Sequence, residues 1–191
     1  MRGAVFLDRD GTINEEVDYL DDPERLRLIP GAPEAIRLLK NAGIPVIVVS
    51  NQSGVGRGYF STATVEAIHQ QLAKRLAMHG ACVDAIYYCP HHPDEGCECR
   101  KPKAGMLLQA ARKHGIDTRR AFMVGDKVSD LDAGRQVGCR TLLVLTGYGE
   151  QARETSKTSV FKPDYISTDL YDAAKWILAE EGVKSLSETS A

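Results

Sequence analysis

The sequence predicts an α/β protein with a doubly wound, mainly parallel sheet and no large cap domain, and three observations lead to this fold class. Short apolar runs alternate along the chain with segments that carry apolar residues at helical spacing, which is typical of a parallel sheet with helices on both faces. The 191 residues are enough for one domain with its own core. With 43% hydrophobic and 26% charged residues, the composition is that of an ordinary globular protein.

Five apolar runs are the expected strands. Short continuous runs of this kind are typical of parallel strands that are buried on both faces of a sheet. The runs are AVFL at 4–7, PVIVVS at 45–50, DAIYY at 84–88, AFMVG at 121–125 and TLLVL at 141–145.

Five amphipathic segments are the expected helices. The first begins at Pro33, which suits a first helical turn, and ends before Gly43, and the second ends before Gly80. The segments are 33–42, 62–79, 105–114, 129–137 and 169–181. Residues 1–181 therefore form the expected single domain, and the polar tail at 182–191 is expected to fray.

The charge balance and the first residues bear on partners and location. The formal net charge is -2 and the basic residues are scattered among acidic ones, so we expect no nucleic-acid partner and favour a small-molecule role. The early apolar run GAVFLD is far too short for a signal-peptide core or a membrane span. We expect a cytoplasmic protein without a membrane partner, and nothing demands more than a monomer.

Two carboxylates follow the first expected strand directly. Asp8 and Asp10 lie at its carboxyl end, where open α/β sheets bind ligands. Two like charges this close are costly unless a cation or a proton separates their roles, and a divalent ion would do so. The long irregular segments at 8–30, 51–61 and 89–104 carry most of the unusual chemistry, as long loops in compact domains often do.

The run DRDGT at 8–12 resembles the first motif of the haloacid dehalogenase superfamily of phosphatases, and the later motifs follow in order. Ser50 ends the second strand at the place of the second motif, Lys101 matches the third, and Asp126 with Asp130 matches the fourth. Taken alone, each residue has an ordinary explanation as a strand-end cap, a helix-start residue or a solvated charge. Four ordered motifs at strand ends and helix starts favour the functional interpretation. The resemblance implies a Rossmann-like haloacid dehalogenase fold.

The resemblance also implies a mechanism. Asp8 attacks phosphorus to give an aspartyl-phosphate, while Asp10 protonates the leaving oxygen and then takes a proton from the hydrolytic water. Ser50 hydrogen-bonds a phosphoryl oxygen, and Lys101 offsets the phosphoryl charge.

A catalytic magnesium ion belongs to the same implied site. Its protein ligands are the Asp8 carboxylate, the Asp10 main-chain carbonyl and Asp126, with water and phosphate completing an oxygen shell. Asp130 supports that shell.

Cysteine and histidine cluster in the loop at 89–100. Residues i and i+2 of an extended backbone face the same way, so Cys89 with His91 and Cys97 with Cys99 can converge on one tetrahedral zinc ion. His92 is the competing imidazole, and its side chain should point away from the pair. A reactive thiol cluster or a chance grouping is the alternative. Four protein ligands leave no open position, so the zinc is expected to be structural.

The other two cysteines, Cys82 and Cys139, lie in or near apolar segments. We expect both to be free, buried thiols. The odd number of five cysteines favours a reducing compartment over disulfides.

Smaller motifs separate two zinc-loop branches of this superfamily, the heptose bisphosphate phosphatases and the histidinol phosphatases. The run QSGVGRGYF at 52–60 resembles the heptose branch, whereas the histidinol branch typically has aspartate in place of Ser53. The run RKPKAGM at 100–106 also resembles the heptose branch, although Ala104 replaces a common proline, and Lys127 agrees with it. The resemblance therefore implies a phosphatase of ADP-heptose and lipopolysaccharide core biosynthesis that removes the C7 phosphate of a heptose bisphosphate.

The same resemblance implies a set of residues that bind a sugar bisphosphate. They are Glu16, Val17, Asp18, Tyr19, Asn51, Gln52, Ser53, Arg57, Arg100 and Lys127. Arg57 or Arg100 suits the second phosphate, because a guanidinium binds such groups in a bidentate manner. Three alternatives remain: a histidinol phosphatase, a broader sugar-phosphate phosphatase, and a non-catalytic zinc-stabilised module that binds phosphate. An intact Asp10 argues against the last, because a general base would shorten the life of an aspartyl-phosphate.

Overall fold

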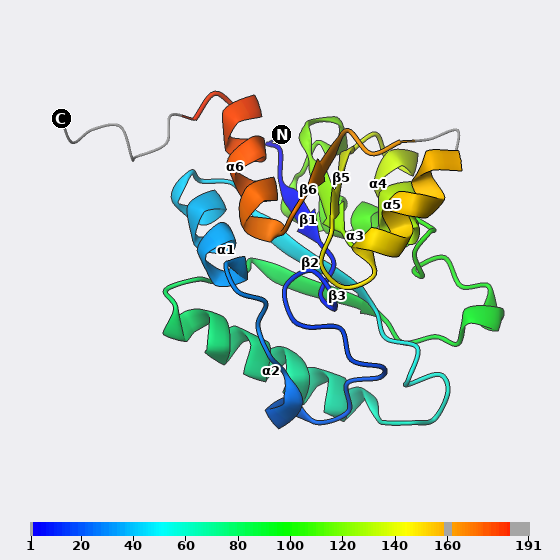
Figure 1. Cartoon of the computed structure of the whole chain (residues 1–191). Coiled ribbons are helices and arrows are strands. Elements are labelled where there is room, and N and C mark those ends of the chain that lie inside the picture. The colour runs from blue at the N-terminus through cyan, green and yellow to red at the C-terminus, as the bar shows by residue number, and fades with distance from the viewer. Residues whose placement is uncertain (1, 159–161, 184–191) are drawn as a thin grey trace.

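Six parallel strands form one sheet at the centre of the molecule. The computed structural model describes residues 2–158 and 162–183. Within them, the strand order is β3-β2-β1-β4-β5-β6, and every neighbouring pair is parallel (Figure 1). The strands are β1 (Val5–Leu7), β2 (Val46–Asn51), β3 (Ala85–Cys89), β4 (Phe122–Gly125), β5 (Arg140–Val144) and β6 (Tyr165–Ser167).

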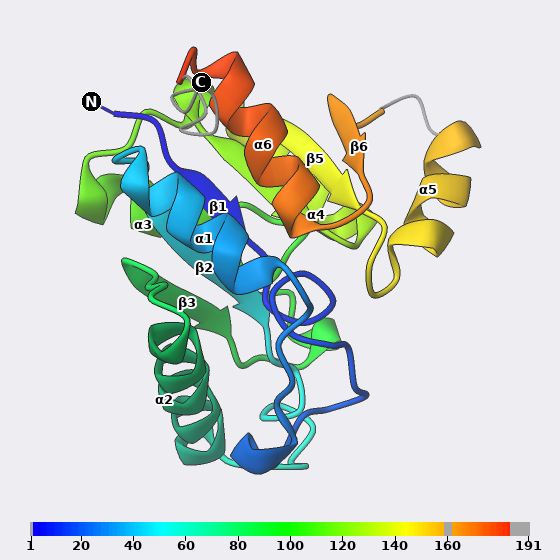
Figure 2. The same ribbon diagram turned by 60° about the vertical axis from the view of Figure 1, so that its left-hand side comes forward.

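Helices cover both faces of this sheet, as the predicted doubly wound class requires. The two helices α1 and α6 lie side by side over one face, and α3 covers the other, while α2 lies beside the edge strand β3 (Figure 2). The helices are α1 (Ala32–Asn41), α2 (Thr62–Met78), α3 (Gly105–His114), α4 (Val128–Gln136), α5 (Gly149–Thr158) and α6 (Leu170–Glu180). No separate cap domain is present in the described part of the chain. The predicted fold class is confirmed.

The central strand β1 shows how the two halves of the core divide. Val5 and Leu7 point to the face that α1 and α6 cover, whereas Phe6 packs on the opposite face with Met106 and Leu107 of α3. Side chains alternate between faces along any strand. Because both faces of β1 are buried, its sequence is continuously apolar, and this is why it was recognisable.

Two described elements, β6 and α5, were not predicted. The strand β6 reads YIS and only its last residue is buried, so it gives no continuous apolar run. The helix α5 reads GEQARETSKT and buries Ala152 against Leu131 and Leu143. A segment with so few apolar residues gives no helical periodicity to detect.

The carboxyl ends of all six strands lie along one edge of the sheet, because the strands are parallel. The long segments after β1, β2 and β3 gather there, together with short loops after β4 and β5 (Figure 1). Among the described residues, no helix is both long and apolar enough to span a membrane. Of the tail expected to fray, residues 184–191 lie outside the part that the structure describes.

Candidate active site

Three aspartates, two from the ends of adjacent strands and one from a helix start, meet at the carboxyl edge of the sheet. Asp8 follows β1, Asp126 follows the neighbouring strand β4, and Asp130 lies in the first turn of α4. One carboxylate oxygen from each lies within 4.8 Å of the others, and all three residues are buried. Asp130 also accepts a hydrogen bond from the Lys127 amide at 3.0 Å, which satisfies a free donor at the start of α4.

Lys101 brings a buried positive charge to these carboxylates. Its Nζ lies 2.8 Å from Asp8 Oδ1 and 2.7 Å from Asp130 Oδ1, and it donates to the Val49 carbonyl at 2.7 Å. The Lys101 backbone is held in turn by Asn51, whose side chain exchanges two hydrogen bonds of 3.0 Å with the Lys101 amide and carbonyl. In the structure the Asn51 side chain therefore fixes Lys101, while its predicted contact with substrate stays a prediction.

The cluster carries more negative than positive charge. Burial, followed by the nearby charge of Asp8, raises the pKa of Asp126 to about 8. Burial also raises the pKa of Asp130 to about 6, with Lys101 opposing this effect. Asp126 Oδ1 is buried and has no hydrogen-bond partner. A hard divalent cation with oxygen ligands would relieve both the excess charge and the unpaired oxygen, so these residues fit magnesium.

Asp10 is held by a set of donors from different segments. Its carboxylate accepts from Arg9 Nη2 at 2.8 Å, from Asn14 Nδ2 at 2.8 Å and from Gln52 Nε2 at 2.9 Å. Burial works to raise the pKa of Asp10, but Arg9 and these hydrogen bonds outweigh it and lower the pKa. In this arrangement Asp10 is therefore held as an ionised carboxylate.

Arg9 and Asn14 were not predicted as site residues. Arg9 is completely buried, which is rare for arginine unless its charge is paired, as it is here with Asp10. Its position between the two aspartates of the first motif is only a weak indication in the sequence that Arg9 is buried. Gln52 also donates to Ser50 Oγ at 2.8 Å, so it connects two residues of the predicted reaction centre.

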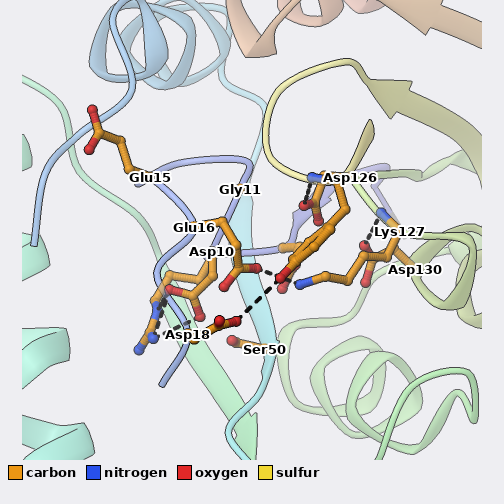
Figure 3. A network of polar contacts seen from close by, with 12 residues as sticks. Asp10, Gly11, Glu15, Glu16, Asp18, Ser50, Asp126, Lys127 and Asp130 are labelled. Carbon is orange, nitrogen blue, oxygen red and sulfur yellow. Dashed lines mark hydrogen bonds and ion pairs between the residues drawn. The ribbon is translucent and has the colours of Figure 1, made fainter. Parts of the chain in front are cut away.

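A pocket of about 530 Å³ opens beside this centre, and most of the predicted substrate residues line it. Asp10, Glu16, Asp18 and Lys127, which Figure 3 labels, all line it, although they come from loops far apart in the sequence. The predicted residues in the lining are Asp10, Glu16, Val17, Asp18, Tyr19, Asn51, Gln52, Ser53, Arg100, Lys101 and Lys127. Those missed are Leu20, Gly54, Phe60, Pro102, Ser129 and Tyr148.

The three cations predicted to bind substrate differ in their surroundings. Lys127 Nζ is paired with Glu16 Oε2 at 2.6 Å. Arg100 lines the pocket, and its buried Nη1 has no hydrogen-bond partner. Arg57 is exposed and is not among the lining residues; its guanidinium lies 5.9 Å from the ring centroid of Tyr19.

The four predicted metal ligands of the cysteine-histidine loop converge. The Sγ atoms of Cys89, Cys97 and Cys99 are 3.2 to 3.5 Å apart, and His91 Nδ1 lies 3.1 Å from Cys99 Sγ. These distances are slightly shorter than the ~3.8 Å between thiolates on one tetrahedral zinc ion. His92 points elsewhere and caps a short 3-10 helix by accepting from the Asp94 amide at 3.2 Å.

The two remaining cysteines differ. Cys139 is buried, as predicted, but Cys82 is exposed, so the prediction for Cys82 was wrong. Cys82 follows the end of α2 and precedes β3, and the turn there directs it to solvent despite its apolar neighbours.

Comparison with known proteins gives the chain a family. Residues 5–87 match the model of haloacid dehalogenase-like hydrolases, and residues 98–173 match a second HAD-like hydrolase model. A D-glycero-D-manno-heptose-1,7-bisphosphate 7-phosphatase from Thermosynechococcus vestitus is 45% identical, with 92% of this chain and 95% of that one covered. The D-glycero-beta-D-manno-heptose-1,7-bisphosphate 7-phosphatase of Pseudomonas aeruginosa is 46% identical, with 78% and 84% covered.

A solved structure agrees with these relatives. The D,D-heptose 1,7-bisphosphate phosphatase from B. bronchiseptica, in complex with magnesium and phosphate, has a TM-score of 0.87 and 39% identity, over 93% of this chain and 99% of that one. High identity over nearly the full length of both proteins, together with the matching fold, shows that the chain belongs to the haloacid dehalogenase-like hydrolases and, within them, to the family of heptose-1,7-bisphosphate 7-phosphatases.

Proposed function

We propose that this chain removes the C7 phosphate of D-glycero-D-manno-heptose 1,7-bisphosphate, a step of ADP-heptose and lipopolysaccharide core biosynthesis. The observation that carries the proposal is the buried cluster of Asp8, Asp126 and Lys101 beside a pocket of about 530 Å³. Relatives of this name at 45% and 46% identity support the choice of substrate.

Asp8 is the proposed nucleophile. Lys101 holds one oxygen of its carboxylate at 2.8 Å, and the other oxygen attacks phosphorus to form an aspartyl-phosphate, with the sugar oxygen as leaving group. Lys101 and the Ser50 hydroxyl then lie where they can stabilise the phosphoryl oxygens. Phosphoryl transfer depends mainly on such positioning and charge stabilisation, so a rigid buried cluster suits it.

Magnesium fits beside this nucleophile. The proposed ligands are the carboxylates of Asp8 and Asp126 and the main-chain carbonyl of Asp10, and the unpaired Asp126 Oδ1 supports this set. When bound, the ion would offset the negative charge that the carboxylates and the phosphate bring together. Asp130 holds Lys101 and the start of α4 in place around it.

Asp10 is the proposed general acid and base. The donors Arg9, Asn14 and Gln52 keep it ionised without substrate, which suits the second step, in which it takes a proton from water that attacks the aspartyl-phosphate. A dianionic phosphate close to Asp10 raises the cost of that negative charge. Substrate binding therefore favours proton uptake by Asp10, and this proton goes to the leaving oxygen in the first step.

Arg100 is the proposed receiver of the C1 phosphate. It lines the pocket with a buried Nη1 that has no hydrogen-bond partner, whereas the charge of Lys127 is already paired with Glu16. A guanidinium with free donors suits a phosphate that is retained through the reaction. Lys127, Glu16 and the neighbouring residues 17–19 are proposed to contact the sugar.

The cysteine-histidine cluster is proposed to hold one structural zinc ion. Its four ligand atoms leave no open position for chemistry. Arg100 and Lys101 directly follow the ligand Cys99, so a fixed loop delivers both cations to the site. Residues 1–181 are proposed to act as one catalytic domain, and the protein as a cytoplasmic monomer.

The test is phosphate release by purified protein, with magnesium, across a panel of phosphate esters. The panel contains heptose 1,7-bisphosphate, heptose 7-phosphate, other sugar monophosphates and bisphosphates, and histidinol phosphate. We expect the highest kcat/KM for the heptose bisphosphate, and a lower value for the 7-phosphate because it lacks the group that Arg100 binds. Analysis of the product by ³¹P NMR should show the C1 phosphate retained.

Arg100→Ala and Arg57→Ala form a matched pair for this panel. Arg100→Ala should shrink the difference between the bisphosphate and the 7-phosphate, and Arg57→Ala, outside the pocket lining, should shrink it less. Faster hydrolysis of histidinol phosphate than of the bisphosphate would overturn the substrate assignment. Absence of turnover on every ester would favour a non-catalytic phosphate-binding module.

A further inference from the structure

Tyr148 lies in a part of the chain that no phosphatase motif of this sequence reaches. It follows β5 and immediately precedes α5, yet it lines the same pocket as Asp10 and Lys101. The turn that carries it is packed against the loop after β1, because the Thr146 hydroxyl donates to the Gly11 carbonyl at 2.6 Å.

The backbone of this turn leaves little freedom. Gly147 has a φ of +55°, and a Cβ atom there would lie only 2.3 Å from Asp126 Oδ2 and 2.6 Å from the Gly11 Cα. The amide of Tyr148 donates to Asp126 Oδ2 at 2.8 Å. The main chain of Tyr148 therefore supports the metal-binding aspartate, and this contact does not depend on which side chain the position carries.

The side chain of Tyr148 makes a separate set of contacts. Its hydroxyl donates to Asp18 Oδ1 at 3.3 Å, and Lys127 Nζ lies 4.8 Å from the centroid of its ring. The same Nζ is paired with Glu16 at 2.6 Å. Glu16 of the loop after β1 thus contacts Lys127, and Asp18 of the same loop contacts the Tyr148 hydroxyl.

All four side chains line the pocket, so together they form one rim of it. In this rim, Glu16 pairs with the Lys127 ammonium from the loop after β4, and Asp18 accepts a hydrogen bond from the Tyr148 phenol after β5. Neither contact involves the residues that hold the reacting phosphate. The rim can therefore change the fit of the sugar without changing the reaction centre.

We propose that the Tyr148 side chain is a positioning residue for substrate selectivity, which holds Asp18 and Lys127 in a fixed rim against the sugar of the substrate. The inference rests on the proposed function in one respect, namely that the substrate is larger than a simple phosphate ester. A fixed rim favours an ester that reaches it, because the rim is already ordered when the sugar binds. A small aromatic ester that stops short of the rim gains nothing from it.

The first experiment compares kcat/KM for heptose 1,7-bisphosphate with kcat/KM for p-nitrophenyl phosphate. Tyr148→Phe removes the bond to Asp18 and keeps the ring, and we expect the ratio of the two values to fall about fivefold, the usual worth of one hydrogen bond. Tyr148→Leu also removes the face under Lys127 and should lower the ratio about tenfold or more. Tyr87→Phe is the matched control, because it removes a phenol contact of 3.1 Å with His114 away from the pocket; the ratio should stay at the wild-type value.

The second experiment separates positioning from general damage. If Tyr148 acts through Asp18, the double variant Tyr148→Phe/Asp18→Ala should have the same ratio of kcat/KM values as Asp18→Ala alone. If Tyr148 had a merely structural role, Tyr148→Phe would lower kcat/KM equally for both substrates and leave the ratio unchanged. That result would overturn the proposal. The proposal would also be overturned if the decrease of the ratio in the double variant were the product of the decreases in the two single variants.

The wild-type rates in the same assay keep this inference distinct from the substrate assignment. A wild-type protein that prefers another large phosphate ester would refute the heptose assignment alone. The ratio is then measured with the preferred ester, because the rim requires only a substrate that extends beyond the reacting phosphate.

Discussion

Replacing Asp126 with asparagine should separate stability from activity. Asp126 is buried beside Asp8 and Asp130, whose carboxylates share Lys101. Burial together with the charge of Asp8 raises the pKa of Asp126 from 3.8 to about 8, although Lys127 opposes this effect. Asparagine has nearly the same shape and can still accept the hydrogen bond from the Tyr148 amide. Without magnesium, the substitution removes a carboxylate that the folded protein tolerates poorly.

The sign and size of the effect follow from this pKa. Between pH 3.8 and about 8 the folded protein keeps a proton on Asp126 that the unfolded chain has released, so the free energy of unfolding falls as pH rises. A difference of about four pKa units corresponds to a destabilisation of the folded protein of about 5 kcal/mol at most. The full destabilisation is present above pH 8. The magnesium-free Asp126→Asn variant should therefore be more stable than wild type at pH 8.5, by up to this amount, and the difference should shrink toward pH 5.

Urea unfolding at several pH values measures this difference. The proteins are dialysed into magnesium-free buffer without a chelator, so that the proposed zinc ion is retained. Adding magnesium at 100 times its Kd should stabilise wild type by about 2.7 kcal/mol and the variant much less, while phosphate release by the variant stays very low. A magnesium-free variant less stable than wild type at pH 8.5 would refute the reasoning, because it would show that the ionised Asp126 carboxylate does not destabilise the folded protein.

Three further predictions concern the reaction centre and the metal loop. Asp8→Asn and Asp10→Asn should each reduce phosphate release by many orders of magnitude with an unchanged circular dichroism spectrum, since uncatalysed phosphate-ester hydrolysis is extremely slow; near-normal rates in purified Asp8→Asn would contradict the mechanism. Lys101→Met leaves the carboxylates of Asp8 and Asp130 without their buried cation and should cost about 3–5 kcal/mol in urea unfolding; a variant as stable as wild type would argue against that pairing. Elemental analysis should find one zinc per chain, and Cys97→Ser should lose it and lower activity; full activity in metal-free protein would refute the zinc assignment.

The site residues that lie directly after a strand could be predicted from the sequence. Asp8 and Asp126 each follow a continuous apolar run, and a parallel sheet brings the carboxyl ends of such runs to one edge. The pairing of Cys89 with His91 could be predicted because alternate residues of an extended chain face the same way, and the structure places both in one cluster with Cys97 and Cys99, with His92 outside it.

Other parts left no pattern in the sequence. Tyr148 lines the pocket because a turn near Gly147 packs on the loop after β1, and such tertiary contacts have no periodicity. Arg9 is buried by its ion pair with Asp10, although its residue type favours the surface. Arg57 was predicted from its place in a motif, but a loop position does not determine which way a long side chain points, and it lies outside the pocket lining.

The order of strands in the sheet has a consequence for synthesis of the protein. The central strand β1 emerges first from the ribosome, but its neighbour β4 begins only at Phe122, and the Thr146 contact with Gly11 spans 135 residues. Until residues 101 and 146 are synthesised, Asp8 lacks the buried charge of Lys101 and the Gly11 carbonyl lacks the Thr146 hydroxyl. Pairing over such separations is also slow to form. We therefore expect a chain truncated before Thr146 to lack phosphatase activity, because the loop after β1 and Asp126 then lack the turn that packs on them.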